Sequence, residues 1–260
     1  MVGRIYATGL ALALGLTVST VAFADPWNGY YIGAFAGGAW SNGDTRTDVE
    51  SDSPARYFTP TSAAAVEASA SGDAHGQAFV GGVQVGANRR FDQFVIGAEI
   101  DYGAFNLGGR QSASDAEYPG FGNLLHYNVD ASYSTDWLFT ARGRLGWLTS
   151  PNLLIYFTGG LAVSDVKVSN SFVDRTAVLN PGAIGGSANS RTKAGYTLGG
   201  GFEFAVAGPW SVKGEYLYVD LGKSHVSSSI RYNNNYNPFD TSVDLTANIA
   251  RIGVNYRLTD

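Results

Sequence analysis

The chain has 260 residues, a formal net charge of −5, no cysteine, 34 glycines and 13% aromatic residues. The negative charge argues against nucleic-acid binding, which relies on basic surfaces, and the lack of cysteine excludes disulfides and thiolate metal sites. Many glycines and aromatic residues, with one methionine and eight prolines, suit a β-barrel.

The N-terminal segment is organised like a secretory signal peptide. Arg4 is the only charge in the first 24 residues, an apolar run extends from Ile5 to about Val21, and Ala22–Ala24 forms a small-x-small cleavage site. We therefore predict a signal peptide at residues 1–24 and one domain at residues 25–260.

Eight segments after residue 26 alternate apolar and polar residues with the period of two of a β-strand. Aromatic residues gather on the apolar face, while charged and small residues gather on the other. The alternation leaves the register of the fifth segment open, because this segment begins apolar on both faces. The predicted strands span about residues 27–40, 77–88, 94–105, 133–147, 153–165, 193–204, 210–221 and 245–258.

The connections between these strands alternate in length. Turns of about five residues follow the second, fourth and sixth strands, and the other connections run for about 20 to 36 residues. Short periplasmic turns and long outer loops are typical of outer-membrane barrels. We predict an all-β fold, an eight-stranded antiparallel transmembrane β-barrel with four long extracellular loops and short periplasmic turns.

Charges on the polar face indicate which face is inside. A soluble barrel with an apolar interior alternates too, but here four acids balance four bases, as the interior of a narrow barrel requires. Two interpretations stay open. The charges either form a salt-bridge network that fills the barrel, or they line an ion path. The predicted polar network of the lumen comprises Glu99, Asp101, Arg142, Arg144, Glu203, Lys213, Glu215 and Arg251.

The aromatic residues support an outer face in lipid. Trp137 and Trp147 share a face ten residues apart, which corresponds to roughly 25 Å along the membrane normal for tilted strands. That distance is the height of the apolar band of an outer-membrane barrel. The predicted aromatic girdles contain Trp40, Trp137, Trp147, Trp210, Tyr216, Tyr218 and Tyr256.

Several segments together resemble one family, the small outer-membrane immunogenic proteins of alphaproteobacteria, which are RopB-type, opacity-like porins. The resemblance covers the mature chain apart from the outer loops. It implies a surface-exposed outer-membrane protein that supports envelope integrity, and some relatives are described as porins or as haem-binding proteins. The segments are Trp27–Gly33 (WNGYYIG), Thr158–Ala162 (TGGLA), Gly195–Glu203 (GYTLGGGFE), Trp210–Gly222 (WSVKGEYLYVDLG) and Arg251–Leu258 (RIGVNYRL).

The last of these segments resembles the closing strand that the outer-membrane assembly machinery reads. Gly253, Tyr256 and Leu258 are its candidate signal residues. The family usually ends on an aromatic residue, whereas this chain has Leu258 there, followed by Thr259 and Asp260. The resemblance implies the assembly machinery, outer-membrane lipid and lipopolysaccharide as partners.

The histidines are the remaining candidates for chemistry. His75, His126 and His225 fall in or beside the predicted outer loops, without the spacing of a metal motif. They are either solvated loop residues or, for His126 and His225, possible contacts for haem. We predict no enzyme activity, no resident cofactor and no metal site. The expected role is structural and interactive, with a small diffusion porin and a haem-binding surface protein as alternatives, and the oligomeric state stays open.

Overall fold

A computed structural model describes residues 25–52, 56–121, 124–176 and 182–258, so the predicted signal peptide lies outside the described residues. These residues form ten antiparallel strands and one helix, and no helix among them is long and apolar enough to cross a membrane. The elements are β1 (Gly29–Val49), α1 (Pro60–Ala70), β2 (Gly72–Phe91), β3 (Phe94–Phe105), β4 (Gly108–Glu117), β5 (Leu125–Ser134), β6 (Trp137–Ser150), β7 (Leu153–Thr176), β8 (Ile184–Ala207), β9 (Trp210–Tyr232) and β10 (Asn235–Leu258).

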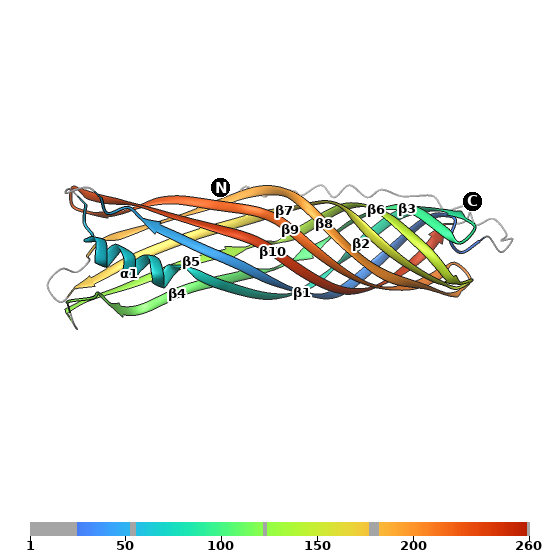
Figure 1. Ribbon diagram of the computed structural model, residues 1–260, viewed down its shortest axis with the longest axis horizontal. Helices are drawn as coiled ribbons and strands as arrows, with labels where there is room; N and C mark the ends of the chain where they lie inside the picture. The colour runs from blue at the N-terminus through green and yellow to red at the C-terminus, as the bar shows by residue number, and fades with distance from the viewer. Residues whose placement is uncertain (1–24, 53–55, 122–123, 177–181, 259–260) are drawn as a thin grey trace, which may run out of the picture.

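Eight of the ten strands close into a long, narrow barrel (Figure 1). Neighbouring strands follow the order β7-β6-β3-β2-β1-β10-β9-β8, and β8 pairs with β7 to complete the ring. The remaining strands, β4 and β5, form a hairpin between β3 and β6, and β5 pairs with β7 beyond the end of β6. The predicted eight-stranded antiparallel barrel is confirmed, and the hairpin is an addition to it.

Tight turns form one end of the barrel, which we call the turn end. They lie at Asp92–Gln93, Pro151–Asn152 and Gly208–Pro209, as the sequence predicted. Asp92 and Gly208 have φ angles of 53° and 56°, the left-handed conformation that two-residue hairpin turns favour. Tyr30 pairs with Leu258, so β1 begins and β10 ends at this same end.

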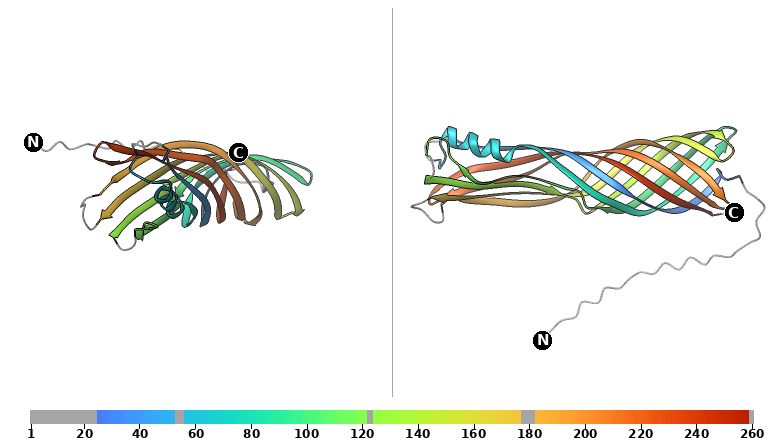
Figure 2. Two further views of the ribbon diagram at one scale, coloured as in Figure 1. Left: turned by 60° about the vertical axis from the view of Figure 1, so that its left-hand side comes forward. Right: turned by 90° about the horizontal axis from the view of Figure 1, so that it is seen from below.

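At the other end, the four long loops predicted from the sequence fold mostly as strand. β1 continues to Val49 instead of ending near Trp40, β7 continues to Thr176, and β10 begins at Asn235. The long connection after the third predicted strand contains the β4–β5 hairpin. The strands therefore continue to the end of the molecule that carries α1, as Figure 2 shows. We call the described parts of residues 41–76, 106–136, 164–195 and 220–247 the extension.

A reversal of the alternation explains why the strand segments of the extension could not be predicted from the sequence. Within the barrel proper, Phe157 and Ile252 point outward and are 76% and 69% exposed, whereas Lys213 points inward and is 1% exposed. In the extension, Asp44 is exposed on the outer face and Val243 is buried inside. A search for apolar residues on the outer face fails there, because that face is polar.

The extension ends in a cap formed by α1 and an aromatic cluster. The hydroxyl of Thr59 accepts a hydrogen bond from the Ser62 N–H and caps the helix. Val66 and Ala70 are fully buried, and the helix packs on β1, β4 and β5. The cap therefore closes the far end of the molecule. Its aromatic members are Phe58, Tyr118, Tyr127, Phe172 and Phe239.

Candidate functional site in the barrel interior

The strand register brings the predicted lumen charges to one level of the interior. Glu99 of β3 pairs with Arg142 of β6, and Glu215 of β9 pairs with Arg251 of β10. Lys213 precedes Glu215 by two residues and so lies on the same inward face. Each of these five residues is at most 5% exposed.

Six of the eight predicted charges form one network, which we call the ionic layer. The Arg142 guanidinium lies 2.5 Å from Glu99 and 2.7 Å from Asp101. It also lies 3.0 Å from Glu215, which Arg251 approaches to 2.5 Å. Three acids and three bases offset one another, which matters because an unpaired charge in a dry interior is strongly destabilising. The layer comprises Glu99, Asp101, Arg142, Lys213, Glu215 and Arg251.

The other two predicted charges form a pair on the turn side of this layer. Arg144 lies 2.7 Å from Glu203, and its guanidinium stacks on the Tyr156 ring, 4.0 Å from the ring centroid. The Tyr31 hydroxyl donates to Glu99 Oε2 at 2.7 Å and accepts from Arg144 at 3.1 Å. Tyr31 thus joins the pair to the ionic layer, and the structure brings all eight predicted lumen residues together.

Uncharged residues complete this network, and the sequence analysis did not assign them to it. Asn255 and Ser211 donate to Glu203 Oε1 at 2.9 and 2.6 Å. Gln84 in turn donates to Asn255 Oδ1 at 2.5 Å. These residues and Tyr31 lie on the inward faces of predicted strands, so alternation would have found them if neutral polar residues had been counted.

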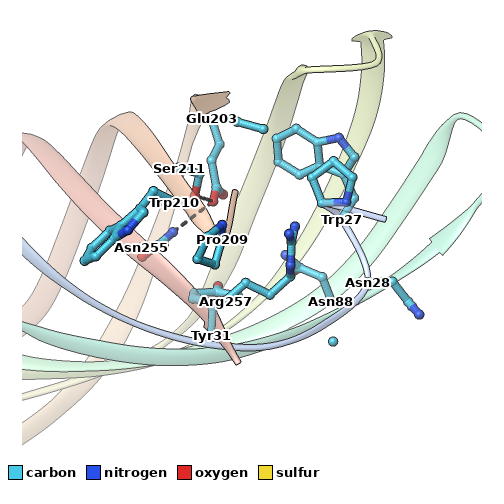
Figure 3. Close-up of a pocket in the computed structure, with 13 residues that line it drawn as sticks. Trp27, Asn28, Tyr31, Asn88, Glu203, Pro209, Trp210, Ser211, Asn255 and Arg257 are labelled. Atoms are coloured by element: carbon cyan, nitrogen blue, oxygen red, sulfur yellow. Dashed lines mark hydrogen bonds between the residues drawn. The ribbon is translucent and has the colours of Figure 1, made fainter. Parts of the chain in front are cut away.

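Trp27 closes the interior at the turn end. Its side chain is 1% exposed, and its indole Nε1 donates to the Pro151 carbonyl oxygen at 2.9 Å. Figure 3 shows the cavity beside it, which Tyr31, Glu203 and Arg257 help to line. The cavity volume is about 20 Å³, which is room for about one water molecule.

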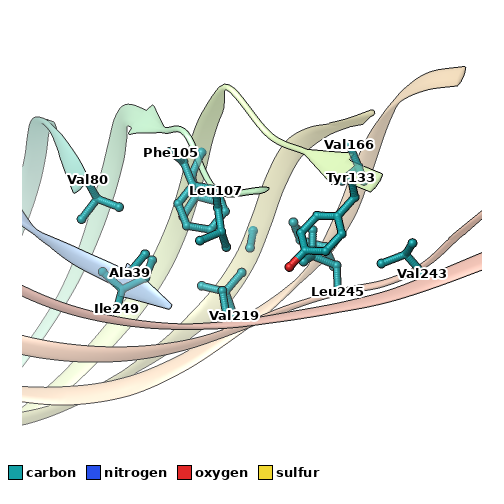
Figure 4. Close-up of a cluster of buried hydrophobic side chains, with 14 of the residues drawn as sticks. Ala39, Val80, Phe105, Leu107, Tyr133, Val166, Val219, Val243, Leu245 and Ile249 are labelled. Carbon is teal, nitrogen blue, oxygen red and sulfur yellow. The ribbon is translucent and has the colours of Figure 1, made fainter. Parts of the chain in front are cut away.

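On the other side of the ionic layer most buried side chains are apolar (Figure 4), with a few hydroxyl side chains such as Ser41 and Thr197 among them. The Arg251 guanidinium stacks on Phe35, 4.2 Å from the ring centroid, and marks the boundary. A cavity of about 10 Å³ there is at the lower limit for a single water. We call the buried cluster beyond it the apolar layer. It comprises Ala39, Ala74, Val80, Phe105, Leu107, Tyr133, Leu138, Ala162, Val166, Val168, Leu217, Val219, Leu221, Val226, Val243, Leu245, Ala247 and Ile249.

All predicted girdle residues occupy outward positions and form two rings of contacts. Near the turn end, the centroids of Trp147 and Phe94 are 5.6 Å apart and those of Trp210 and Tyr256 are 4.9 Å apart. The second set of contacts, which we call the outer aromatic ring, lies where the extension begins. Its pairs are Trp40–Tyr216 at 6.1 Å, Trp137–Tyr102 at 5.9 Å and Tyr218–Tyr196 at 6.3 Å.

The predicted assembly residues lie on the closing strand. β10 pairs with β1 from Tyr30↔Leu258 to Val49↔Phe239. Gly253 lies on the inward face and Tyr256 on the outward face, 36% exposed. Their role as an assembly signal remains a prediction.

The histidines proposed as haem contacts lie on strands, and this corrects their expected place in loops. His126 on β5 pairs with Arg175, and its Nδ1 lies 3.6 Å from an Asp115 carboxylate oxygen. His225 on β9 is exposed and pairs with Ser242. β7 and β8 stand between β5 and β9, a distance of about 14 Å along the wall. The two histidines therefore lie on separate parts of the wall. Within the described ranges, no group of three His, Asp or Glu side chains is placed to hold a metal ion.

Known proteins match this chain over most of its length. The family model of the outer membrane protein beta-barrel domain matches residues 8–257. The chain belongs to this family. A 31 kDa outer-membrane immunogenic protein of Brucella melitensis biotype 1 is 32% identical over 235 residues, which cover 89% of this chain and 83% of the relative.

One further relative matches over a shorter length, and one solved structure is similar at low sequence identity. A 22 kDa outer membrane protein of Rhizobium leguminosarum is 32% identical over 148 residues, 57% of this chain and 55% of the relative. The crystal structure of OprG from Pseudomonas aeruginosa aligns over 89% of this chain and 98% of its own, with 14% identity and a TM-score of 0.43.

Membership in the outer membrane barrel family confirms the predicted family and location. The apolar outer face between the two aromatic rings meets lipid. In barrels of this class the short turns face the periplasm, so the turn end is periplasmic and the extension lies outside the cell.

Proposed function

We propose that this barrel is a closed scaffold that supports the envelope and presents its extension at the cell surface, without conducting solutes and without catalysis. The observation that supports the proposal is the packing of the interior. Trp27, the ionic layer, the apolar layer and the cap follow one another along the barrel. A haem-binding surface protein is a less favoured alternative, because His126 and His225 lie on separated strands and do not form one site together.

A diffusion pore is the less favoured function for two physical reasons. The side chains of Arg142 and Lys213 have no exposed surface, so the ionic layer offers no hydrated surface to a passing ion. The apolar layer comes next, and a solute that enters it loses its hydration and meets few polar groups in return. Both layers would have to open together for transport.

The surface role draws on the extension. Its outer face is polar and carries exposed charges such as Asp44, Arg46 and Asp48. The Brucella relative is named an immunogenic protein, and the extension supplies the surface that antibodies would meet on this chain. A packed interior and a strand-built extension together suit a rigid display scaffold.

Single-channel recording tests the proposal. The protein without residues 1–24 is refolded and inserted into a planar bilayer, and its folding is verified by faster migration of the unboiled sample on a detergent gel. We expect a silent membrane, while an open porin in the same bilayer gives steps. Stable, reproducible steps from verified folded protein would refute the closed scaffold and favour the diffusion pore.

A further inference from the structure

The strands β8 and β9 separate just above the outer aromatic ring. They pair at Tyr196↔Asp220 and again at Gly185↔Ile230, with no register pairs between these points. Over the same stretch β8 stays paired with β7, and β9 stays paired with β10. The wall therefore contains a slit with two free strand edges, residues 186–195 and residues 221–229.

A β-bulge accounts for the separation. Leu221 and Gly222 of β9 face a single residue of β10, Leu245. Gly222 has a φ of 66°, and its N–H donates to the Asp220 carboxylate at 2.8 Å. A bulge bends its strand and increases the local twist, which turns β9 away from β8.

Side chains define the two ends of the slit. At the lower end, the Lys193 ammonium reaches across and donates to the Lys223 carbonyl oxygen. At the upper end, Asn170 Oδ1 accepts from the Ser187 N–H and from the Ser228 hydroxyl, both at 3.0 Å. The opening is thus a bounded feature of the wall.

Both edges of the slit are basic. Arg191 and Lys193 lie an even number of residues from the fully buried Thr197, so they occupy inward positions of β8. Arg191 is nevertheless exposed, because β9 does not cover it. Lys223 is 79% exposed although Asp244 lies 4.0 Å away. Residues 184–195 and 221–232 contain no acid, and their basic residues are Arg191, Lys193, Lys223, His225 and Arg231.

The cations lie at the height of lipid headgroups. The rings of Tyr196 and Tyr218 mark the outer interface. Lys193 and Arg191 follow three and five residues above Tyr196, which is about 8 and 13 Å along the membrane normal for tilted strands. Cations at this height meet the phosphates of the outer leaflet.

The neighbouring wall has the opposite charge at a similar height. Asp44, four residues above Trp40, pairs with Asp73 on one side and with Asp244 on the other. The basic character is therefore local to the slit. Arg46, exposed on β1, offers a matched cation outside it.

We propose that the slit between β8 and β9 binds the phosphate groups of an outer-leaflet lipid, which in this membrane is lipopolysaccharide. The phosphates enter sideways from the membrane plane and meet Arg191, Lys193 and Lys223. The Lys223 carbonyl points toward β8, so the N–H groups of His225 and Ser227, on alternate residues, point into the slit as further donors. The inference rests on the outer-membrane location and not on the closed lumen.

A titration with purified lipid A tests this site. The folded barrel in phosphatidylcholine nanodiscs is titrated with bisphosphorylated lipid A, and bound lipid is counted by native mass spectrometry. Replacing both slit cations in an Arg191→Gln, Lys193→Gln variant should weaken binding about 25-fold, at about fivefold for each cation. Arg46→Gln should leave binding unchanged, and Lys193→Arg alone should preserve it. Faster migration of the unboiled variants verifies that each has folded.

Three results would overturn the lipid site. Binding by the double variant equal to that of the parent protein would leave the slit cations only the role of preventing strand pairing, a common function of lysine at free edges. Lipid A without phosphates would bind equally well if the acyl chains alone were recognised. Displacement of lipid A by polyglutamate, but not by excess inorganic phosphate, would assign the free edges to an acidic peptide.

Discussion

The two layers of the interior are packed in opposite ways within one set of strands. The ionic layer holds six charged side chains where the outer face meets lipid. The apolar layer holds residues such as Phe105 and Leu217 at 0% exposure, beside and beyond the outer aromatic ring. The side chains of both layers are buried, so the difference between the layers does not follow from burial alone.

The difference follows from the medium outside. If a strand were apolar on both faces, its sequence would not determine which face turns inward, because a slip of one residue exchanges the two faces. Within lipid the outer face must be apolar, so the inner face carries the charges. In the extension the outer face carries Asp44 and Asp48 in water, and hydrocarbon is free to fill the inside. The packing of each layer is thus the complement of its surroundings.

Removal of one cation from the ionic layer should have the largest effect. Arg142→Met keeps much of the side-chain volume but leaves Glu99, Asp101 and Glu215 with less positive charge. We expect a loss of about 3–5 kcal/mol in the free energy of unfolding, because the remaining buried carboxylates are no longer compensated. Urea titration of the protein in lipid vesicles, followed by tryptophan fluorescence, measures this loss.

An exposed cation provides the control for that variant. Lys167 is 48% exposed and pairs with Asp136 on the surface, so Lys167→Met should leave the free energy of unfolding nearly unchanged. Equal effects of the two substitutions would show that water reaches Arg142, and the ionic layer would then be a hydrated passage.

Truncation in the apolar layer should have the next largest effect. Leu217→Ala removes a side chain with 0% exposure and should cost about 3 kcal/mol through lost burial and the cavity left behind. Leu145→Ala is its counterpart on the lipid face, where the side chain is 55% exposed. The same urea titration should give about 1 kcal/mol or less there, because lipid chains refill the space. A reversed order would mean that the apolar layer is loosely packed.

The same contrast explains how much of the fold could be predicted from the sequence. Charges such as Glu99 and Arg142 interrupt an apolar alternation, so the barrel strands and their inward faces were predictable. The alternation in the extension is reversed, and the predicted aromatic girdle did not by itself show that the strands continue beyond the lipid. Ser and Thr also occupy inward positions there, as at Thr45 and Thr47, and they make those segments look like loops.

The site was predictable only in part for a related reason. Alternation assigns a face to each residue, and this was enough to place all eight charges in the lumen. Partners across the barrel depend on the stagger of the closed sheet, which brings Tyr31 to Glu99 across a separation of 68 residues. The separation of β8 and β9 depends on a bulge at Gly222, and a glycine in a strand does not reveal by itself which neighbour will detach.

The smallest predicted effect concerns the cap, where a third kind of packing occurs. Asp174 is 2% exposed and accepts a hydrogen bond from the Tyr57 hydroxyl, while its Oδ1 has no partner among the described residues. It is thus a buried carboxylate held chiefly by tyrosines, unlike the compensated acids of the ionic layer. Burial raises the pKa of Asp174 above its ordinary value of 3.8.

The sign of the pH effect follows from this raised pKa. The folded cap holds the proton to a higher pH than the unfolded chain does, so the cap is most stable below the ordinary pKa and loses stability as pH rises through the raised one. Hydrogen exchange of the α1 amides, corrected for intrinsic rates, should show opening that becomes easier over that range. Asp174→Asn should abolish this dependence, and Asp48→Asn, at an exposed carboxylate, should retain it. If the dependence persisted in Asp174→Asn, another group would have to control the cap, and the contrast between compensated and uncompensated buried acids would not explain its stability.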